Sequence, residues 1–153
     1  MVLQLGDAGF EVIVYDNCST GCADSILYGE LGIGELADTQ LLYKVLSQHQ
    51  FSAVLHFAAS LIVPESVARP LDYYSNNTRN TLNLLQCCNL TGINKIIFSS
   101  TAAVYGEPEK VPVTESTPTQ PINPYGRSKL MSEWLIQDYA AASNLKYVIL
   151  RYF

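Results

Sequence analysis

A tyrosine and a lysine stand four residues apart near the start of a predicted helix. Tyr125 and Lys129 belong to the segment Tyr-Gly-Arg-Ser-Lys, and residues at this spacing share one face of a helix. A phenolate can act as a base on an alcohol, but forming it near neutral pH takes about 4 kcal/mol of stabilisation. An ammonium group about 6 Å away, at an effective dielectric constant of about 20, supplies about 3 kcal/mol. A second cation is therefore needed, and an oxidised nicotinamide ring provides one.

Hydroxyl side chains end the predicted strand that precedes this helix. Ser99, Ser100 and Thr101 lie at that strand end, where a hydroxyl can hydrogen-bond both a substrate alcohol and a phenolate. Each feature alone has an ordinary structural explanation, because Tyr-x-x-x-Lys is often a solvated pair and Ser or Thr often forms a turn. Their succession along one chain is much rarer. It predicts interconversion of an alcohol and a carbonyl group with NAD.

Short apolar segments alternate with longer amphipathic segments along the chain. The predicted strands cover residues 10–15, 52–57, 95–99 and 146–153, and the predicted helices cover residues 36–48, 70–92 and 124–143. This alternation predicts an α/β fold with a Rossmann-like, doubly wound parallel sheet in three α/β/α layers. Ligands bind such sheets at the carboxyl ends of the strands. Asp16, the pair Ala58-Ala59 and residues 99–101 stand at these ends.

Composition narrows the classes of partner. The 153-residue chain has 9 Lys and Arg against 14 Asp and Glu, a net charge of -5, which disfavours binding to nucleic acid or to an anionic membrane. No apolar run approaches the ~20 residues of a membrane helix, and the first residues lack the basic start of a signal peptide. The cytoplasm is therefore the expected location. The four cysteines lack the spacing of zinc ligands, since Cys18 and Cys22 are four residues apart and Cys87 and Cys88 are adjacent. We therefore predict reduced thiols and no metal site.

Seven short segments together resemble one protein family. They are YDN at 15–17, HFAA at 56–59, PES at 64–66, PLDYYSNN at 70–77, FSSTAAVYGEP at 98–108, NPYGRSKLMSE at 123–133 and LRYF at 150–153. Their order and spacing are similar to those of the extended short-chain dehydrogenase/reductases and, within them, of the UDP-glucose 4-epimerases. The resemblance implies tightly bound NAD, a UDP-sugar substrate such as UDP-glucose or UDP-galactose, a role in galactose metabolism and a homodimer of the full-length protein.

The resemblance also implies roles for single residues. Tyr125 takes the proton of the sugar 4-hydroxyl, and Lys129 stabilises the phenolate and binds a ribose. The hydroxyl of Thr101 forms a bridge between the substrate hydroxyl and the phenolate. A hydride passes to NAD and then returns to the other face of a transient 4-keto sugar. The residues assigned to the cofactor are Asp16, Asn17, Cys18, Ser19, Glu35, Leu36, Phe57, Ala58, Ala59, Leu61, Asn76, Ser99, Tyr125, Lys129 and Phe153. Those assigned to the substrate are Thr101, Ala102, Ala103, Tyr125 and Phe153.

Asp16 also has an interpretation of its own. A carboxylate after this strand can accept hydrogen bonds from the adenosine ribose and favours NAD over NADP, although an aspartate there is more often a turn residue. Three positions depart from the family pattern. Leu61 replaces a lysine found in many relatives, Glu35 replaces an aspartate, and Pro64 replaces a common glycine. None of the three removes the groups that carry the chemistry.

Three alternatives stay open. A nucleotide-sugar dehydratase of the same fold has Asp-Glu directly after the strand-end hydroxyl, and Ala102 and Ala103, which cannot transfer protons, stand there instead. A 4-epimerase for UDP-glucuronate or UDP-N-acetylglucosamine has the same catalytic residues. The third alternative is a non-catalytic remnant.

Residues 1–9 resemble the end of a helix with no strand or glycine-rich turn before it, and Phe153 ends a predicted strand. We therefore expect residues 1–153 to be a partial NAD-binding domain without its substrate domain, inactive alone.

Overall fold

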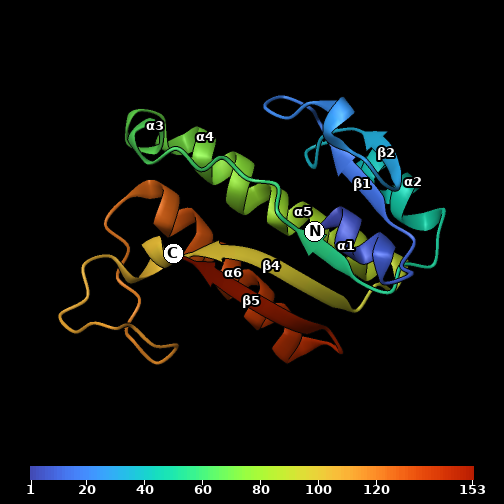
Figure 1. Cartoon of the computed structure of the whole chain (residues 1–153). Coiled ribbons are helices and arrows are strands. Elements are labelled where there is room, and N and C mark those ends of the chain that lie inside the picture. Colours follow the sequence, from blue (N-terminus) through green and yellow to red (C-terminus); the bar gives the residue numbers. More distant parts are fainter.

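The computed structural model describes residues 1–153 and contains five parallel strands in two sheets (Figure 1). In the first sheet β1 (Ile13–Asp16) pairs with β2 (Glu30–Ile33). In the second sheet β4 (Lys95–Thr101) lies between β3 (Val54–His56) and β5 (Lys146–Tyr152). The predicted α/β fold with parallel strands is confirmed. The strands are divided between two sheets because β1 and β3 are not hydrogen-bonded to each other.

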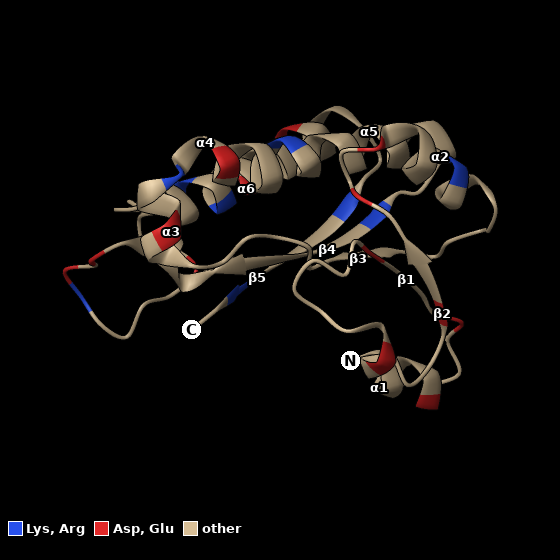
Figure 2. Ribbon diagram, turned by 90° about the horizontal axis from the view of Figure 1, so that it is seen from above, with Lys and Arg blue, Asp and Glu red and all other residues tan.

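The longer helices lie together over one face of the strands (Figure 2). They are α2 (Thr39–Ser47), α5 (Asn80–Thr91) and α6 (Pro124–Ala142). The short helices are α1 (Val2–Asp7), α3 (Val63–Ala68) and α4 (Pro70–Tyr73), and a π-helical segment, Tyr74–Arg79, joins α4 to α5. In Figure 2 the short helix α1 lies on the opposite side of the strands. The helical layer on that side is therefore much smaller than the layer formed by α2, α5 and α6. No helix has both the length and the apolar character of a membrane span.

Local sequence explains where the main helices begin and end. Asp38 caps α2, since its Oδ1 accepts a hydrogen bond from the Leu41 amide at 2.9 Å, and Asn123 caps α6 by accepting from the Gly126 amide at 2.8 Å. Each cap satisfies an amide that the first helical turn leaves without a partner. Helix α5 ends at Gly92, whose φ of 75° lies in the left-handed region that glycine adopts most easily. The predicted boundaries are therefore within a few residues of the observed ones.

The hydrophobic core lies between these helices and the second sheet. Its members are Leu42, Leu46, Leu84, Leu85, Cys87, Cys88, Ile93, Ile96, Phe98, Ile136 and Leu145. All 25 buried residues of the chain lie between Leu42 and Leu145, so the first sheet contributes none of them. Cys87 and Cys88 are buried free thiols, and burial raises the pKa of Cys88 to about 12. This core holds α6 against β4, the two elements that carry the candidate catalytic residues.

Besides the short 3-10 helices, three elements were not predicted from the sequence. Strand β2 is four residues long and contains Gly32, so it lacks the apolar run that marks a buried strand. Helix α3 has six residues, and all but one of its helical positions are at least partly exposed. The π-helical segment lies inside the stretch predicted as one helix from Pro70 to Gly92. Such turns often occur at functional sites.

Candidate active site

The first turn of α6 packs against the end of β4 through a glycine. A Cβ atom on Gly126 would lie 2.6 Å from the carbonyl oxygen of Ala103, so a larger residue cannot make this approach without displacing the backbone. Ala103 lies in a short 3-10 helix, Ala102–Tyr105, that follows β4 directly. Tyr125, the neighbour of Gly126, is half-buried, and its ring meets the edge of the Tyr73 ring at 6.5 Å. The glycine therefore brings the candidate base to the strand end.

Lys129 lies one turn further along α6 and is almost completely buried, with 3% of its surface exposed. Its Nζ donates a hydrogen bond to the carbonyl oxygen of Ser99 at 2.8 Å and lies 4.9 Å from the centre of the Phe98 ring. Burial lowers the pKa of Lys129 to about 8. The ammonium form still predominates at neutral pH, so the side chain places a positive charge inside the protein at the carboxyl end of β4.

The three hydroxyl residues at the end of β4 have different contacts. Ser99 holds Lys129 by its carbonyl group. Ser100 is buried and donates to the carboxylate of Glu133 at 2.5 Å. Thr101 is half-buried, and its Oγ1 accepts from the Ala103 amide at 3.1 Å, which leaves its O–H able to donate to a ligand. The structure thus brings Thr101, Tyr125 and Lys129 to one strand end, as expected, and their catalytic roles stay predictions.

His56, at the end of β3, is a buried neighbour of this charge. Its Nε2 lies 2.9 Å from Thr81 Oγ1, and its ring centre is 5.4 Å from that of Phe98. Burial, and after it the charge of Lys129, lowers the pKa of His56 to about 3. The imidazole therefore stays neutral at physiological pH, and its contacts with Thr81 and Phe98 are those of a buried structural residue.

The π-helical segment fixes the loop that follows β3. Asn77 is buried, accepts from the Ser60 amide at 2.8 Å, and donates to the Ser60 carbonyl at 2.9 Å and to Ser128 Oγ at 3.0 Å. Asn76, next to it, donates to Ser60 Oγ at 2.9 Å and is exposed. Asn77, Ser60 and Ser128 together tie this loop to α6. Sequence reasoning assigned Asn76 and missed Asn77, whose buried position follows from the wider π turn.

The loop after β3 presents further residues assigned to a cofactor. Phe57 and Ala58 are exposed, Ala59 is half-buried, and Leu61 is exposed. They follow His56, the last residue of β3, and so lie at the carboxyl end of that strand. An exposed apolar loop held rigidly from behind is suited to pack against a ligand that crosses the strand ends.

The residues at the carboxyl ends of β1 and β2 form a second group. One carboxylate oxygen of Asp16 accepts from the Cys18 amide at 2.7 Å, and Asn17 similarly accepts from the Ser19 amide at 3.0 Å. Asp16 is therefore a turn former, and its other oxygen has no partner in the protein. Glu35 is exposed, and its carbonyl accepts from the Tyr15 hydroxyl at 3.2 Å. Leu36 packs against the core.

A cavity of about 510 Å³ opens beside the end of β5. Residues from the 3-10 helix, from the loop at 106–113 and from the chain end line it, among them Ala102, Tyr105 and Phe153. Phe153 is 91% exposed, and its ring stacks on that of Tyr105 at 6.4 Å. Two residues assigned to the substrate, Ala102 and Phe153, therefore share an apolar cavity next to the strand end that carries Thr101.

The groups at these strand ends fit a dinucleotide. Lys129 uses one of its three donors within the protein, Asp16 keeps one carboxylate oxygen, and the side chain of Asn76 is exposed. Ammonium and carboxylate groups in these places suit the two ribose units of a dinucleotide, whose hydroxyls donate and accept. The chemistry of these donors and acceptors is thus consistent with NAD.

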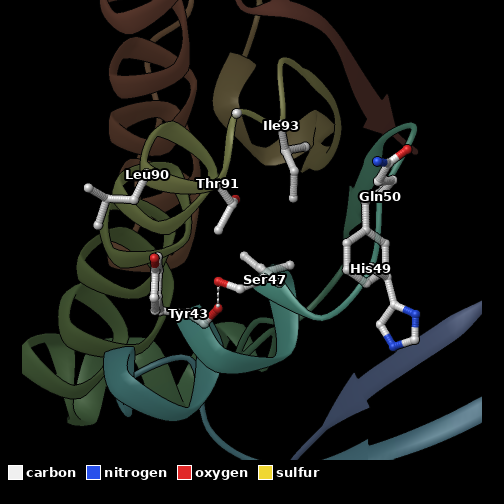
Figure 3. Close-up of a pocket in the computed structure, with 10 residues that line it drawn as sticks. Tyr43, Ser47, His49, Gln50, Leu90, Thr91 and Ile93 are labelled. Atoms are coloured by element: carbon white, nitrogen blue, oxygen red, sulfur yellow. Dashed lines mark hydrogen bonds between the residues drawn. The ribbon is translucent and has the colours of Figure 1, made fainter.

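A separate cavity of about 400 Å³ lies at the opposite end of the second sheet (Figure 3). It is formed by the end of α2, the loop that leads to β3 and the segment that joins α5 to β4, with Tyr43, His49 and Thr91 in its wall. The only hydrogen bond drawn there joins Ser47 Oγ to the Tyr43 carbonyl at 2.6 Å. The wall lacks a cluster of ionisable side chains, so we assign it no chemistry.

Comparison with known proteins gives consistent results. The family model for GDP-mannose 4,6 dehydratase matches residues 4–153. The UDP-glucose 4-epimerase of Azospirillum brasilense is 52% identical over 150 residues, which are 97% of this chain and 43% of that protein. The structure of UDP-glucose 4-epimerase from Brucella ovis in complex with NAD matches with a TM-score of 0.97 at 43% identity, over 99% of this chain and 47% of that one.

A third match includes both a cofactor and a nucleotide. UDP-glucose 4-epimerase from Bifidobacterium longum, in complex with NAD+ and UDP, has a TM-score of 0.95 at 37% identity and covers 99% of this chain and 48% of that one. The chain thus spans about half the length of the relatives that it matches. Because the family model covers residues 4–153 and the same fold recurs at high identity, the chain belongs to the family described as GDP-mannose 4,6 dehydratase.

Proposed function

We propose that this chain is part of an NAD-dependent 4-epimerase of UDP-sugars, with UDP-glucose and UDP-galactose as the substrates. The observation that carries the proposal is the buried ammonium of Lys129, held by Ser99 one helical turn from Tyr125. The relatives with NAD and UDP bound support the cofactor and the nucleotide. Residues 1–153 are then part of the NAD-binding domain, and the recognition of the sugar depends largely on other residues.

The mechanism assigns a separate task to each side chain. NAD, held at its two ribose units by Asp16 and Lys129, would supply the hydride chemistry at the sugar C4, by which the hydride can leave one face and return to the other. Tyr125 accepts the proton of the 4-hydroxyl and later gives it back, Lys129 stabilises the phenolate by its charge, and Thr101 orients the hydroxyl by a hydrogen bond. The packing of Gly126 on Ala103 keeps base and strand end in a fixed geometry, which is the condition for efficient proton transfer.

Ala102 and Ala103 favour epimerisation over loss of water. Eliminating water from a 4-keto sugar requires an additional acid and base beside the substrate, and two methyl groups occupy the positions after Thr101. The nearest buried carboxylate on α6, Glu133, is engaged by Ser100 and Arg151. The site therefore supports the transfer of a hydride and a proton and lacks the groups for dehydration, although the family model is named after a dehydratase.

Apolar side chains on the outer faces of α5 and α6 support the homodimer that the resemblance implies. Leu82 and Leu90 on α5 and Met131 and Trp134 on α6 are each at least 40% exposed. Tyr139 and Asn89 join the two helices by a hydrogen bond of 2.8 Å. A second copy would cover this surface. The choice among UDP-glucose, UDP-glucuronate and UDP-N-acetylglucosamine, and a cytoplasmic location, stay predictions from the sequence.

A hybrid enzyme tests the proposed reaction. This chain replaces the matching part of the A. brasilense epimerase, which supplies the remaining residues, and the hybrid is incubated with UDP-galactose. We expect UDP-glucose as the product, formed without loss of mass, because the strand end has no second acid and base. The 153-residue chain assayed alone with NAD is expected to show no turnover, since it spans less than half of that relative.

Product analysis by chromatography and mass spectrometry decides between the alternatives, because chromatography separates C4 epimers, which have equal mass, and mass spectrometry detects the loss of water. A 4-keto-6-deoxy sugar, which has lost one water, would contradict the choice of epimerase over dehydratase. A folded hybrid that inverts C4 in none of the three substrates, UDP-glucose, UDP-glucuronate and UDP-N-acetylglucosamine, would instead support the non-catalytic alternative.

A further inference from the structure

Two opposite charges are buried one turn apart on α6 without pairing. Lys129 and Glu133 are 3% and 0% exposed, and residues four apart on a helix are close enough to form an ion pair. No salt bridge joins them, because Lys129 donates to Ser99 and Glu133 pairs with Arg151. Buried charges usually occur in pairs, so the separation of this pair needs an explanation.

Arg151 and Ser100 together engage both carboxylate oxygens of Glu133. Arg151 donates to both carboxylate oxygens, from Nη2 at 2.6 Å and from Nε at 3.0 Å, and Ser100 Oγ donates at 2.5 Å. Ser100 and Arg151 are direct partners in the register of β4 and β5. Two adjacent strands thus hold the carboxylate from one side, and a guanidinium fork is the geometry that fits a carboxylate best.

Arg151 is itself fixed by an aromatic side chain. Its Nη1 donates to the Tyr105 hydroxyl at 2.9 Å, and its guanidinium lies 4.9 Å from the centre of the same ring. The hydrogen bonds with Glu133 raise the pKa of Arg151 above its ordinary value. The arginine is therefore a permanent cation that cannot easily turn away from Glu133.

The other neighbours of Lys129 provide no negative charge. His56 on β3 is neutral, Phe98 and Ser99 on β4 offer a ring face and a carbonyl oxygen, and Tyr125 precedes Lys129 by one turn of α6. Tyr73, on α4, meets Tyr125 at 6.5 Å. Glu133 is thus the one buried carboxylate on the same face of α6 that could pair with Lys129.

We propose that Arg151 is a positioning residue that holds the carboxylate of Glu133 away from Lys129, so that the ammonium stays at the strand end beside Tyr125. The inference depends on the proposed function for its catalytic meaning, because only there must the charge of Lys129 act on a phenolate. The separation of Lys129 from Glu133, which the inference explains, exists whether or not the chain catalyses a reaction. Without Arg151, the buried carboxylate has Lys129 as its nearest alternative cation on the helix, and pairing along the helix draws the ammonium away from Ser99.

The test measures the titration of Lys129 in the 153-residue chain. The five lysines are labelled with ¹³C at Cε, and the Lys129 signal is identified by its loss in Lys129→Arg. In the wild type we expect a pKa near the value of about 8 set by burial. In Arg151→Met the unpaired carboxylate stabilises the ammonium, so the pKa of Lys129 rises by about 1 pH unit or more. No turnover is needed, so a failure of the proposed reaction leaves this result unaffected.

The double variant Glu133→Gln/Arg151→Met separates charge from packing. It removes both charges and folds even where the single variant does not, because replacing a buried ion pair as a whole is often neutral for stability. The pKa of Lys129 returns to the wild-type value. Arg69→Met is the matched control, since Arg69 pairs with Asp72 on the surface, and it leaves Lys129 unchanged.

Two results would overturn the inference. An unchanged or lower pKa of Lys129 in folded Arg151→Met means that Arg151 does not shield Lys129 from Glu133. A fall in the double variant below the wild-type value means that Glu133 already stabilises the ammonium in the native protein. Either result leaves Arg151 as a structural residue only.

Discussion

The two ends of the candidate site belong to regions that are packed very differently. The strand ends assigned to the adenosine half of a cofactor lie within residues 1–41, where no residue is buried. The candidate catalytic strand end belongs to the rest of the chain, which contains all 25 buried residues and the ion pair of the buried Glu133 with Arg151. In the first region Asp16 and Asn17 hold turns by local hydrogen bonds. In the second, buried side chains join different elements.

This difference shows where the fold fixes geometry. A base, an ammonium and a hydroxyl must be held to within a fraction of an ångström to act together, and the densely packed region holds them from two elements, α6 and β4. A ribose or adenine needs only hydrogen bonds and a surface, which exposed turns can supply. Matched substitutions in the two regions should therefore differ in their effects on stability.

Core truncation gives the largest contrast. Ile136 is completely buried in α6, whereas Ile33 at the end of β2 is 65% exposed. Ile136→Ala should lower the free energy of unfolding by about 2–5 kcal/mol, and Ile33→Ala should change it by less than about 0.5 kcal/mol. Urea unfolding followed by circular dichroism measures both. Equal losses would show that the two regions do not differ in packing.

Replacing one glycine in each region, Gly126 and Gly21, should give a smaller difference in the free energy of unfolding than core truncation does. Gly126→Ala places a Cβ 2.6 Å from the Ala103 carbonyl, and Gly21→Ala meets nothing within 4 Å. We expect Gly126→Ala to cost about 1–3 kcal/mol by overpacking and to displace Tyr125. Gly21→Ala should be close to neutral. Tolerance of Gly126→Ala, in both urea unfolding and turnover of the hybrid, would refute the proposed role of this close contact.

Acid should destabilise the chain through the densely packed region. The pKa of His56 is lowered to about 3 in the folded state from the ordinary value of 6.5, so the unfolded chain binds the proton first as the pH falls. This contribution to stability is present above pH 6.5 and is lost as the pH falls toward 3. Between pH 7.5 and 5.5 the loss is about 1.4 kcal/mol.

His56→Gln isolates this effect, because glutamine does not titrate. The wild type should lose about 1.4 kcal/mol more than the variant between pH 7.5 and 5.5, as measured by urea unfolding at the two pH values. Equal losses in the two proteins would mean that the imidazole can be protonated in the folded state. The burial of His56 between Thr81 and Phe98 would then be too loose to exclude charge.

Much of the fold followed from local signals in the sequence. The apolar runs that became β3, β4 and β5, the caps Asp38 and Asn123, and Gly92 placed the main elements within a few residues. Strand β2 was missed because four residues that include a glycine give no periodicity. The exposure of Val148, which is 50% exposed on the edge strand β5, was also not predictable, since an apolar run looks the same in an edge and a central strand.

The candidate site was only partly predictable. Tyr125, Lys129 and Thr101 could be found because their types and spacing are rare together. The Glu133 and Arg151 pair could not, because the partners are 18 residues apart and meet only through the packing of α6 on β5. Asn77 was missed for a related reason. Its burial depends on the π-helical turn, and no propensity in the sequence indicated that turn.

In the proposed reaction, Tyr125 is the base that takes the proton from the sugar. In the hybrid enzyme, Tyr125→Phe removes one oxygen atom and keeps the ring that packs on Tyr73. We expect kcat for UDP-galactose to fall by about 10²–10⁴-fold, with unchanged folding and NAD binding. Tyr147→Phe, at an exposed position on β5, should keep full activity as the matched control. A Tyr125→Phe enzyme that retains turnover within about twofold of the wild type would contradict the account.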